Sequence, residues 1–331
     1  MLLLIKYTLL YGIVLMLVAL GGMFSEHSGI INIALEGIMV IGGVAGVLTL
    51  TMLPADLSPF LTVLISVLVA ALAGVVYSLL LAFASINLKA DQTIGGTALN
   101  LMAPALVLFF IRLLANQNTL QMYTGDSASW FMIKKTMLGY AKTDKLGFFA
   151  ETFLNKVYLA TYLCILIYVI LAVILYKTRF GLRLRSCGEN PQAADSLGIN
   201  VVKMRYAGVT ISGALAGLGG FVYAMTTANC SANGDVAGFG FLALAVMIFG
   251  NWKPLNVAGA ALLFGLFKCV AASYASLDLN GDGVFRLKEI GVNINFYRIL
   301  PYLITLVVLA FTSKSSRAPK AEGIPYDKGS R

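Results

Sequence analysis

A group of oxygen-bearing side chains with the spacing of a Ca²⁺-binding loop lies between residues 278 and 289. Its members are Asp278, Asn280, Asp282 and Glu289, with Gly283 at the turn. Loops of this kind bind Ca²⁺ through carboxylate, amide and backbone oxygens. Arg286 occupies a position that usually supplies a small polar or acidic ligand. A structural Ca²⁺ site and a turn rich in Asp and Asn therefore both remain open as interpretations.

The sequence contains no arrangement of residues that would support catalysis. It has one histidine, His27, and four scattered cysteines that form no CxxC pair. One histidine cannot build a histidine-based metal site or nucleophile, and isolated cysteines in apolar runs are typical of packing. There is no Gly-Lys dipeptide, so the chain lacks the GxxxxGK[ST] loop that holds nucleotide phosphates. We therefore expect no enzymatic activity and no cofactor in this chain.

A short helix with a defined start and end is predicted after residue 190. Asn190 suits the N-cap, Pro191 the first helical position, and Gly198 the position after the last turn. Its apolar side chains would be Ala193, Ala194, Leu197 and Ile199, and the nearby cations are Arg183 and Arg185. A helix of about two turns is marginal alone, so its neighbours or a partner must hold it. A rigid peg that receives force from a partner and an ordinary capped loop are the two interpretations.

Polar side chains also occur inside long apolar stretches, where burial is costly unless they face the interior of a helix bundle. The candidates are Asn32, Glu36, Gln92, Asn100 and Ser212. Asn32 and Glu36 are four residues apart and would share one face of a helix. These side chains could line a pathway for a polar solute. Hydrogen bonding between helices, and an interfacial role for Glu36, remain open. Lys268 is expected to extend outward to water, and a charge in the pore is the alternative.

The elements that must position these residues are long and apolar. Of the 331 residues, 59% are hydrophobic and 12% are charged, whereas a soluble domain has about 25% charged residues. Several stretches without Asp, Glu, Lys or Arg reach the roughly 20 residues that a helix needs to cross a bilayer. The composition disfavours soluble, disordered and fibrous proteins, and the pattern of a transmembrane barrel is absent. We expect an all-α integral membrane protein, a polytopic bundle of about 8–10 transmembrane helices.

The expected spans are 2–22, 30–52, 60–83, 93–114, 156–176, 206–227, 239–250, 254–277 and 298–313. The piece 239–250 is too short to cross a bilayer unaided. It would be re-entrant or would join the following span.

Loop charges orient the chain, because Lys and Arg gather on the cytoplasmic side of membrane proteins. We attribute the net charge of +9 to this effect, since no nucleic-acid motif is present. The basic loop 177–205 is placed inside, and the loops 115–155 and 278–297 are placed outside. The expected domains are a transmembrane domain, 1–313, and a loose polar cytoplasmic tail, 314–331.

Three stretches in the expected order carry a resemblance to one family. The pattern R-x-x-G-x-N-P-x-A-A-x-x-x-G-I is matched by Arg185, Gly188, Asn190, Pro191, Ala193, Ala194, Gly198 and Ile199. Residues 28–39 resemble an N-terminal signature, and residues 238–254 resemble a late-span motif. The chain thus resembles the permease subunits of ATP-binding-cassette (ABC) importers of the branched-chain amino-acid, ribose and nucleoside family. Within it, the chain resembles the nucleoside and simple-sugar branch linked to basic membrane lipoproteins.

The resemblance implies a type II importer-like permease in a bacterial cytoplasmic (inner) membrane, with a cytoplasmic C-terminus. It implies a nucleoside as the leading solute. Partners would be a cytoplasmic ABC ATPase holding ATP and Mg²⁺, a second permease in a homo- or heterodimer, and an extracytoplasmic binding protein or lipoprotein. The coupling contact with the ATPase would then lie on the capped segment.

Several alternatives remain at this level. The solute could be a simple sugar or a vitamin with a ribosyl or ribityl group. A stand-alone secondary transporter would be expected to show inverted repeats and paired intramembrane charges, and Glu36 is the one convincing acid found. An intramembrane enzyme is disfavoured because no catalytic arrangement is visible.

Overall fold

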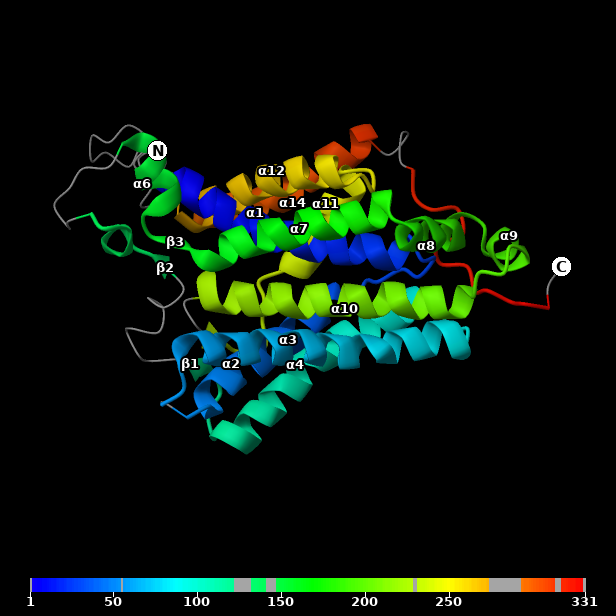
Figure 1. Cartoon of the computed structure of the whole chain (residues 1–331), viewed down its shortest axis with the longest axis horizontal. Coiled ribbons are helices and arrows are strands. Elements are labelled where there is room, and N and C mark those ends of the chain that lie inside the picture. The colour runs from blue at the N-terminus through cyan, green and yellow to red at the C-terminus, as the bar shows by residue number, and fades with distance from the viewer. Residues whose placement is uncertain are drawn as a thin grey trace.

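The computed structural model describes residues 2–54, 56–121, 132–140, 147–228, 231–273, 293–312 and 317–329. Within these ranges long helices run side by side along the longest axis of the molecule (Figure 1). The long helices are α1 (Leu2–Glu26), α2 (Leu35–Met52), α3 (Pro59–Ala82), α4 (Gln92–Ala115), α7 (Leu159–Lys177), α10 (Val201–Thr226), α12 (Pro254–Ser273) and α14 (Ile294–Thr312). Shorter elements are the π-helix η1 (Phe83–Asn87), the 3₁₀-helix η2 (Lys135–Leu138), α6 (Phe148–Leu154), α8 (Arg179–Glu189), α9 (Pro191–Ser196) and α11 (Phe239–Phe249).

Seven of the helices in the described ranges are long and apolar enough to cross a membrane. They are α1, α2, α3 continued by η1, α4, α7, α10 and α12. α11 is apolar but has only 11 residues, as the sequence predicted for the piece 239–250. The predicted all-α polytopic membrane bundle is confirmed.

The core of the bundle is built around α1, α2 and α10. In α1 and α10, 78% of the most apolar window is buried. Glycines allow these backbones to approach closely: a Cβ placed on Gly42 of α2 would collide with the backbone of Gly217 of α10. Likewise, a Cβ on Gly220 would collide with the carbonyl of Met39. Small residues of this kind let transmembrane helices pack backbone to backbone.

The outer helices α3, α4 and α7 expose most of their apolar side chains. Only 28%, 22% and 22% of their most apolar windows are buried. Leu101 of α4, for example, is 76% exposed and Phe60 of α3 is 75% exposed. Such a surface suits lipid, because apolar side chains there avoid contact with water.

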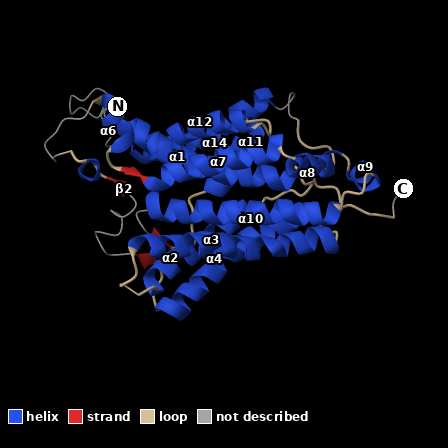
Figure 2. Cartoon of the chain, in the orientation of Figure 1, coloured by secondary structure: helices blue, strands red, loops and turns tan. Residues whose placement is uncertain are grey.

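Two small antiparallel pairs form at one end of the bundle. β1 (Leu120–Gln121) pairs with β4 (Ser231–Ala232), and β2 (Met132–Ile133) pairs with β3 (Val157–Tyr158). Figure 2 shows these strands at the end opposite α8, α9 and the C-terminus. The pairs join loops that are far apart in the sequence, so they shape this end of the molecule.

The structure corrects three sequence-based expectations. α1 extends to Glu26, and residues 27–34 are not helical, so the second span begins at Leu35 rather than at residue 30. The loop 177–205 contains an additional helix, α8, before the predicted short one. The part of the tail that the structure describes, 317–329, is not loose, because its backbone hydrogen-bonds to the bundle.

Candidate functional site

α9 is the capped helix that the sequence predicted. The Asn190 side chain accepts a hydrogen bond from the backbone N–H of Ala193 at 3.0 Å, and Pro191 is the first helical residue. Gly198 follows with φ +78°, a conformation that favours glycine. α7 leads into α8 and α9, and α10 leads away from them, so α9, which we call the peg, is held between two long apolar helices (Figure 1).

The two faces of this segment differ sharply. Leu197 is 81% exposed, and Ala193 and Arg183 are also exposed. In contrast, Ala194 is 2% exposed and packs with Cys187 and Val201. The exposed face is therefore available to a partner, whereas the buried face fixes α9 to the bundle.

Two other predicted residues face inward. The guanidinium of Arg185 lies 4.6 Å from the ring centroid of Tyr176 on α7, rather than pointing out toward a partner. Gly188 is buried against the carbonyl of His27, and a Cβ there would collide with it. α8 is therefore in direct contact with the end of α1.

The described part of the tail ties α8 to the junction between α1 and α2. Ala321 N–H donates to Gly188 C=O at 2.8 Å, and Gly323 N–H donates to Gly29 C=O at 3.2 Å. Farther along, Lys89 and Asp327 form an exposed ion pair at 3.0 Å. The tail thus forms a strap, residues 317–329, across the end that carries the peg.

Buried ionisable groups lie in and beneath this strap. Glu26 is 4% exposed and accepts a hydrogen bond from Trp252 Nε1 at 2.5 Å. Burial raises the pKa of the neighbouring Glu322 carboxyl to about 7. Burial also lowers the pKa of His27 to about 4. Arg205 is 1% exposed, and its guanidinium lies 5.9 Å from the ring centroid of Tyr326.

The polar residues predicted inside the membrane largely hold the non-helical stretch 27–34. Asn32 donates to Ser212 Oγ at 2.8 Å. Gln92 accepts from the N–H of Ile31 at 2.7 Å. Asn100 accepts from Gly37 N–H and donates to Ile33 C=O, both at 2.8 Å. Side chains of α4 and α10 therefore replace the hydrogen bonds that a continuous helix would supply.

Glu36 binds the start of α11. Its carboxylate accepts from the N–H groups of Gly238, Gly240 and Phe241 at 2.9, 2.6 and 3.2 Å. A carboxylate is favourable at a helix N-terminus, where N–H groups lack partners within the helix. Lys268 does not extend away from the protein: its Nζ donates to Ala237 C=O at 2.7 Å and lies 4.8 Å from the ring centroid of Phe239.

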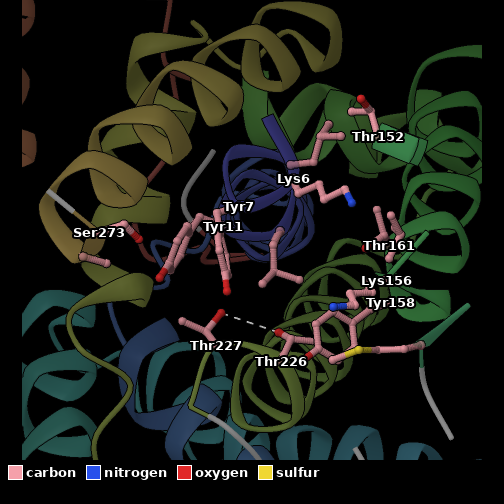
Figure 3. A pocket seen from close by; sticks show the side chains of 15 residues that line it. Lys6, Tyr7, Tyr11, Thr152, Lys156, Tyr158, Thr161, Thr226, Thr227 and Ser273 are labelled. Carbon is pink, nitrogen blue, oxygen red and sulfur yellow. Dashed lines mark hydrogen bonds between the residues drawn. The ribbon is translucent and has the colours of Figure 1, made fainter. Parts of the chain in front are cut away.

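A cavity of about 360 Å³, lined by both apolar and polar side chains, lies at the end opposite the peg. It is lined by residues of α1, α6, α7, the end of α10, the end of α12 and the β2–β3 pair. Figure 3 shows Tyr7 and Tyr11 with their hydroxyl ends directed toward the side where Thr226 and Thr227 lie. Lys156 extends toward Thr226 from the opposite wall.

The predicted Ca²⁺ ligands, Asp278, Asn280, Asp282 and Glu289, lie outside the described residues. Among the residues that are described, no group of three or more His, Cys, Asp or Glu side chains could hold a metal ion.

The sequence does not predict the cavity or the strap. Arg205 belongs to the basic loop 177–205, but its position at the start of an apolar stretch is a signal of burial. Glu26, close after the first predicted span, carries a similar signal. The cavity residues offered no local signal, because they come from segments far apart in the chain.

Apolar helices long enough to cross a membrane, a capped short helix at one end and a cavity at the other are the architecture of a polytopic membrane protein. A profile of the family described as the permease component of branched-chain amino acid transport systems matches residues 4–309. The chain belongs to this family.

Two relatives match along nearly the whole chain. The guanosine ABC transporter permease protein NupQ of Bacillus subtilis is 41% identical, over 98% of this chain and 96% of that protein. The nucleoside ABC transporter permease protein NupC of Lactococcus lactis is 39% identical, over 97% of this chain and 95% of that protein. No solved structure matches the chain.

Proposed function

We propose that this chain is the membrane-spanning subunit of an ABC importer and that its solute is a nucleoside. The near full-length similarity to permeases named for guanosine and nucleoside transport carries the proposal. The location that fits it is the bacterial inner membrane, with the peg and the C-terminus on the cytoplasmic side. ATP and Mg²⁺ would be held by a separate ATPase.

The proposed ATPase contact is the exposed surface of α8, of the peg and of Leu197 directly after it. Leu197, 81% exposed, would provide its apolar centre, and Arg183 would pair with acids of the ATPase. Asn190, Pro191, Gly198 and Ile199 would keep the helix in shape, and Gly188, Ala194 and Arg185 would fix it to the bundle. A second permease subunit, identical or related, and an extracytoplasmic binding protein or lipoprotein would complete the importer.

Few contacts separate the peg from the polar side chains inside the bundle. α8 contacts His27 through Gly188, and the non-helical stretch 27–34 begins there. Asn32, Glu36, Gln92, Asn100 and Ser212 hold that stretch and the start of α11. We infer that ATP binding moves the peg, and that these side chains change partners as the pathway switches from outward- to inward-open. A ligand drives such a switch only through different contacts in the two states.

Transport by the reconstituted complex tests this function. Proteoliposomes that contain the permease, its ATPase and its binding protein should accumulate radiolabelled guanosine. Accumulation should require ATP in the compartment that the ATPase faces. Guanosine uptake by the permease without the ATPase would refute the proposal, as would sugar uptake without nucleoside uptake.

A variant of the peg tests the docking face. Leu197→Asp places a charge on the exposed face and should reduce co-purification of the ATPase at least about tenfold, the effect expected for loss of an apolar interface anchor. Met137→Asp is the matched control, because Met137 is 68% exposed at the other end of the molecule. Equal ATPase retention by both variants would contradict docking at Leu197.

The Ca²⁺ interpretation of residues 278–289 is kept as a separate proposal for a structural site. Isothermal titration of the purified permease with Ca²⁺, compared with the Glu289→Gln variant, tests it. Equal heats in the two proteins would rule the site out.

A further inference from the structure

The cavity in Figure 3 has the size and the lining of a ligand site. Its volume of about 360 Å³ falls within the roughly 300–1,000 Å³ of small-molecule pockets. It lies between helices of one chain, at the end away from the peg. We propose that this cavity binds a purine nucleoside that carries an oxygen at position 6 of the ring. The proposal rests on the proposed function and names the solute class more narrowly.

Aromatic walls provide surfaces for the base. Tyr7 and Tyr11 are one helical turn apart on α1, with ring centroids 6.4 Å from each other, and Tyr158 is on the opposite side of the cavity. Tyr7 is 37% exposed, so its ring is accessible. Stacking of a base on an aromatic ring is favourable and tolerates any base. The tyrosines therefore favour a flat heteroaromatic ligand over a simple sugar.

Hydroxyl groups cluster on another wall. Thr226 and Thr227 lie at the end of α10, and Thr161 lies at the start of α7. Thr226 Oγ1 already donates to Val222 C=O at 2.5 Å and is left as an acceptor. A hydroxyl without such a bond both donates and accepts, so this wall can bind the ribose hydroxyls of a nucleoside. The wall thus complements the sugar, as the tyrosines complement the base.

Two lysines line the cavity, and one of them can contact the base. Lys6 is already engaged, since its Nζ donates to Asn155 C=O at 2.8 Å and lies 3.9 Å from the Glu151 carboxylate. Lys156 is exposed at the cavity, and its ammonium makes no hydrogen bond or ion pair within the part of the chain that the structure describes.

An ammonium group only donates hydrogen bonds. Guanine presents two adjacent acceptors, O6 and N7, whereas adenine presents an amino donor beside N7. Lys156 therefore favours a 6-oxo purine.

The backbone holds Lys156 in an unusual conformation that aims it at the cavity. Its φ is +53°, in the left-handed region that non-glycine residues rarely adopt. The Lys156 N–H donates to Ile133 C=O at 2.8 Å, next to the β2–β3 pair. Residues held by their neighbours in a strained backbone conformation occur often at ligand sites.

The cavity is also connected to the peg. α7 and α10 contribute Thr161 and Thr226 to the cavity at one end, and at the other end they flank α8 and α9. A nucleoside that contacts both helices would change their relative position along their length. The site is thus placed where its occupancy can be sensed at the ATPase contact.

Direct binding tests the inference without relying on transport. Equilibrium binding of radiolabelled guanosine is measured on the permease–ATPase complex in nanodiscs, without the binding protein, and is repeated with a purine nucleoside that lacks the 6-oxygen. Wild type should bind guanosine saturably and more tightly than the analogue.

Lys156→Met should weaken guanosine binding about tenfold and abolish the preference over the analogue, because one good base contact gives about 1–3 kcal/mol of discrimination. Tyr7→Ala should weaken both ligands, by about 5-fold to 100-fold.

The matched controls lie near the same end of the molecule. Lys134→Met and Tyr140→Ala change exposed residues that do not line the cavity, and they should bind like wild type. Absence of guanosine binding in wild type, or unchanged binding and preference in Lys156→Met, would overturn the inference. ATP-dependent uptake is measured separately on the complete importer. Absence of ATP-dependent uptake would refute the proposed function. Successful uptake together with unchanged guanosine binding in the variants would refute only the proposed binding cavity.

Discussion

Replacing Glu36 by glutamine separates two roles for this residue, a cap on α11 and a solute contact. The carboxylate accepts three N–H groups, at 2.9, 2.6 and 3.2 Å. Glutamine offers one oxygen, and its amide nitrogen would face a donor. At least one N–H of Gly238, Gly240 or Phe241 would then be left without a partner.

The cost follows from these contacts. An unsatisfied buried donor costs about 1–3 kcal/mol, and loss of a negative charge at a helix N-terminus costs about 0.3–2 kcal/mol. We therefore expect Glu36→Gln to lower the free energy of unfolding by about 1–5 kcal/mol. At about 2 °C per kcal/mol, the melting temperature should fall by about 2–10 °C.

The assay combines thermal unfolding in detergent with hydrogen exchange of the α11 amides. The amides of Gly240 and Phe241 should lose protection in the variant. Glu189→Gln is the control, because Glu189 is an exposed acid at the end of α8. A different result would refute the capping role: Glu36→Gln would melt at the same temperature as wild type and keep the α11 amides protected, but would raise the KM for nucleoside uptake. Glu36 would then contact the solute.

Three further outcomes test other parts of the structure. Gly188→Ala should lower the stability of the permease by about 1–3 kcal/mol in thermal unfolding, because its Cβ would meet the His27 carbonyl, whereas Gly259→Ala, with open space around it, should not. Ser212→Ala should cost about 1–3 kcal/mol in the same assay, because the buried Asn32 amide loses its acceptor; no loss relative to Ser196→Ala would contradict this. Docking of the strap should weaken as pH rises. Burial raises the pKa of Glu322 from 4.5 to about 7, so the docked state binds more protons in that interval and is favoured at its acidic end. Exchange of the Ala321 and Gly323 amides, taken relative to Glu322→Gln at each pH, should rise between about pH 5 and about pH 8; a constant ratio would exclude the linkage.

The capped peg could be predicted from sequence because its rules are local. An N-cap at Asn190, a proline at the first position and a glycine after the last turn each act within a few residues. The helical bundle could be predicted for a similar reason, since a long apolar stretch can satisfy its backbone in a membrane only as a helix.

The break at residues 27–34 could not be predicted in the same way. Ile30, Ile31 and Ile33 are apolar, so the sequence pattern predicts that they belong to a membrane span. The groups that make the break tolerable, Gln92 and Asn100, lie on another helix. The docking of the strap could not be predicted either. Its polar composition suggests mobility, but its backbone binds the carbonyls of Gly29 and Gly188, which no local sequence pattern reveals.

The distribution of hydrogen bonds indicates where the molecule can change shape. Within α1, α2 and α10, close glycine contacts and internal helical bonds make sliding costly. Between α1 and α2, by contrast, the backbone is held by amide and hydroxyl side chains, which can exchange one partner for another at little net cost, since each bond contributes about 0.5–1.5 kcal/mol. This stretch lies against α8 through His27 and Gly188, and α8 carries the peg. Under the coupling proposed above, a movement of the peg would therefore reach the hydrogen bonds of residues 27–34 through α8, and α7 and α10 connect the same end of the molecule to the cavity at the other end.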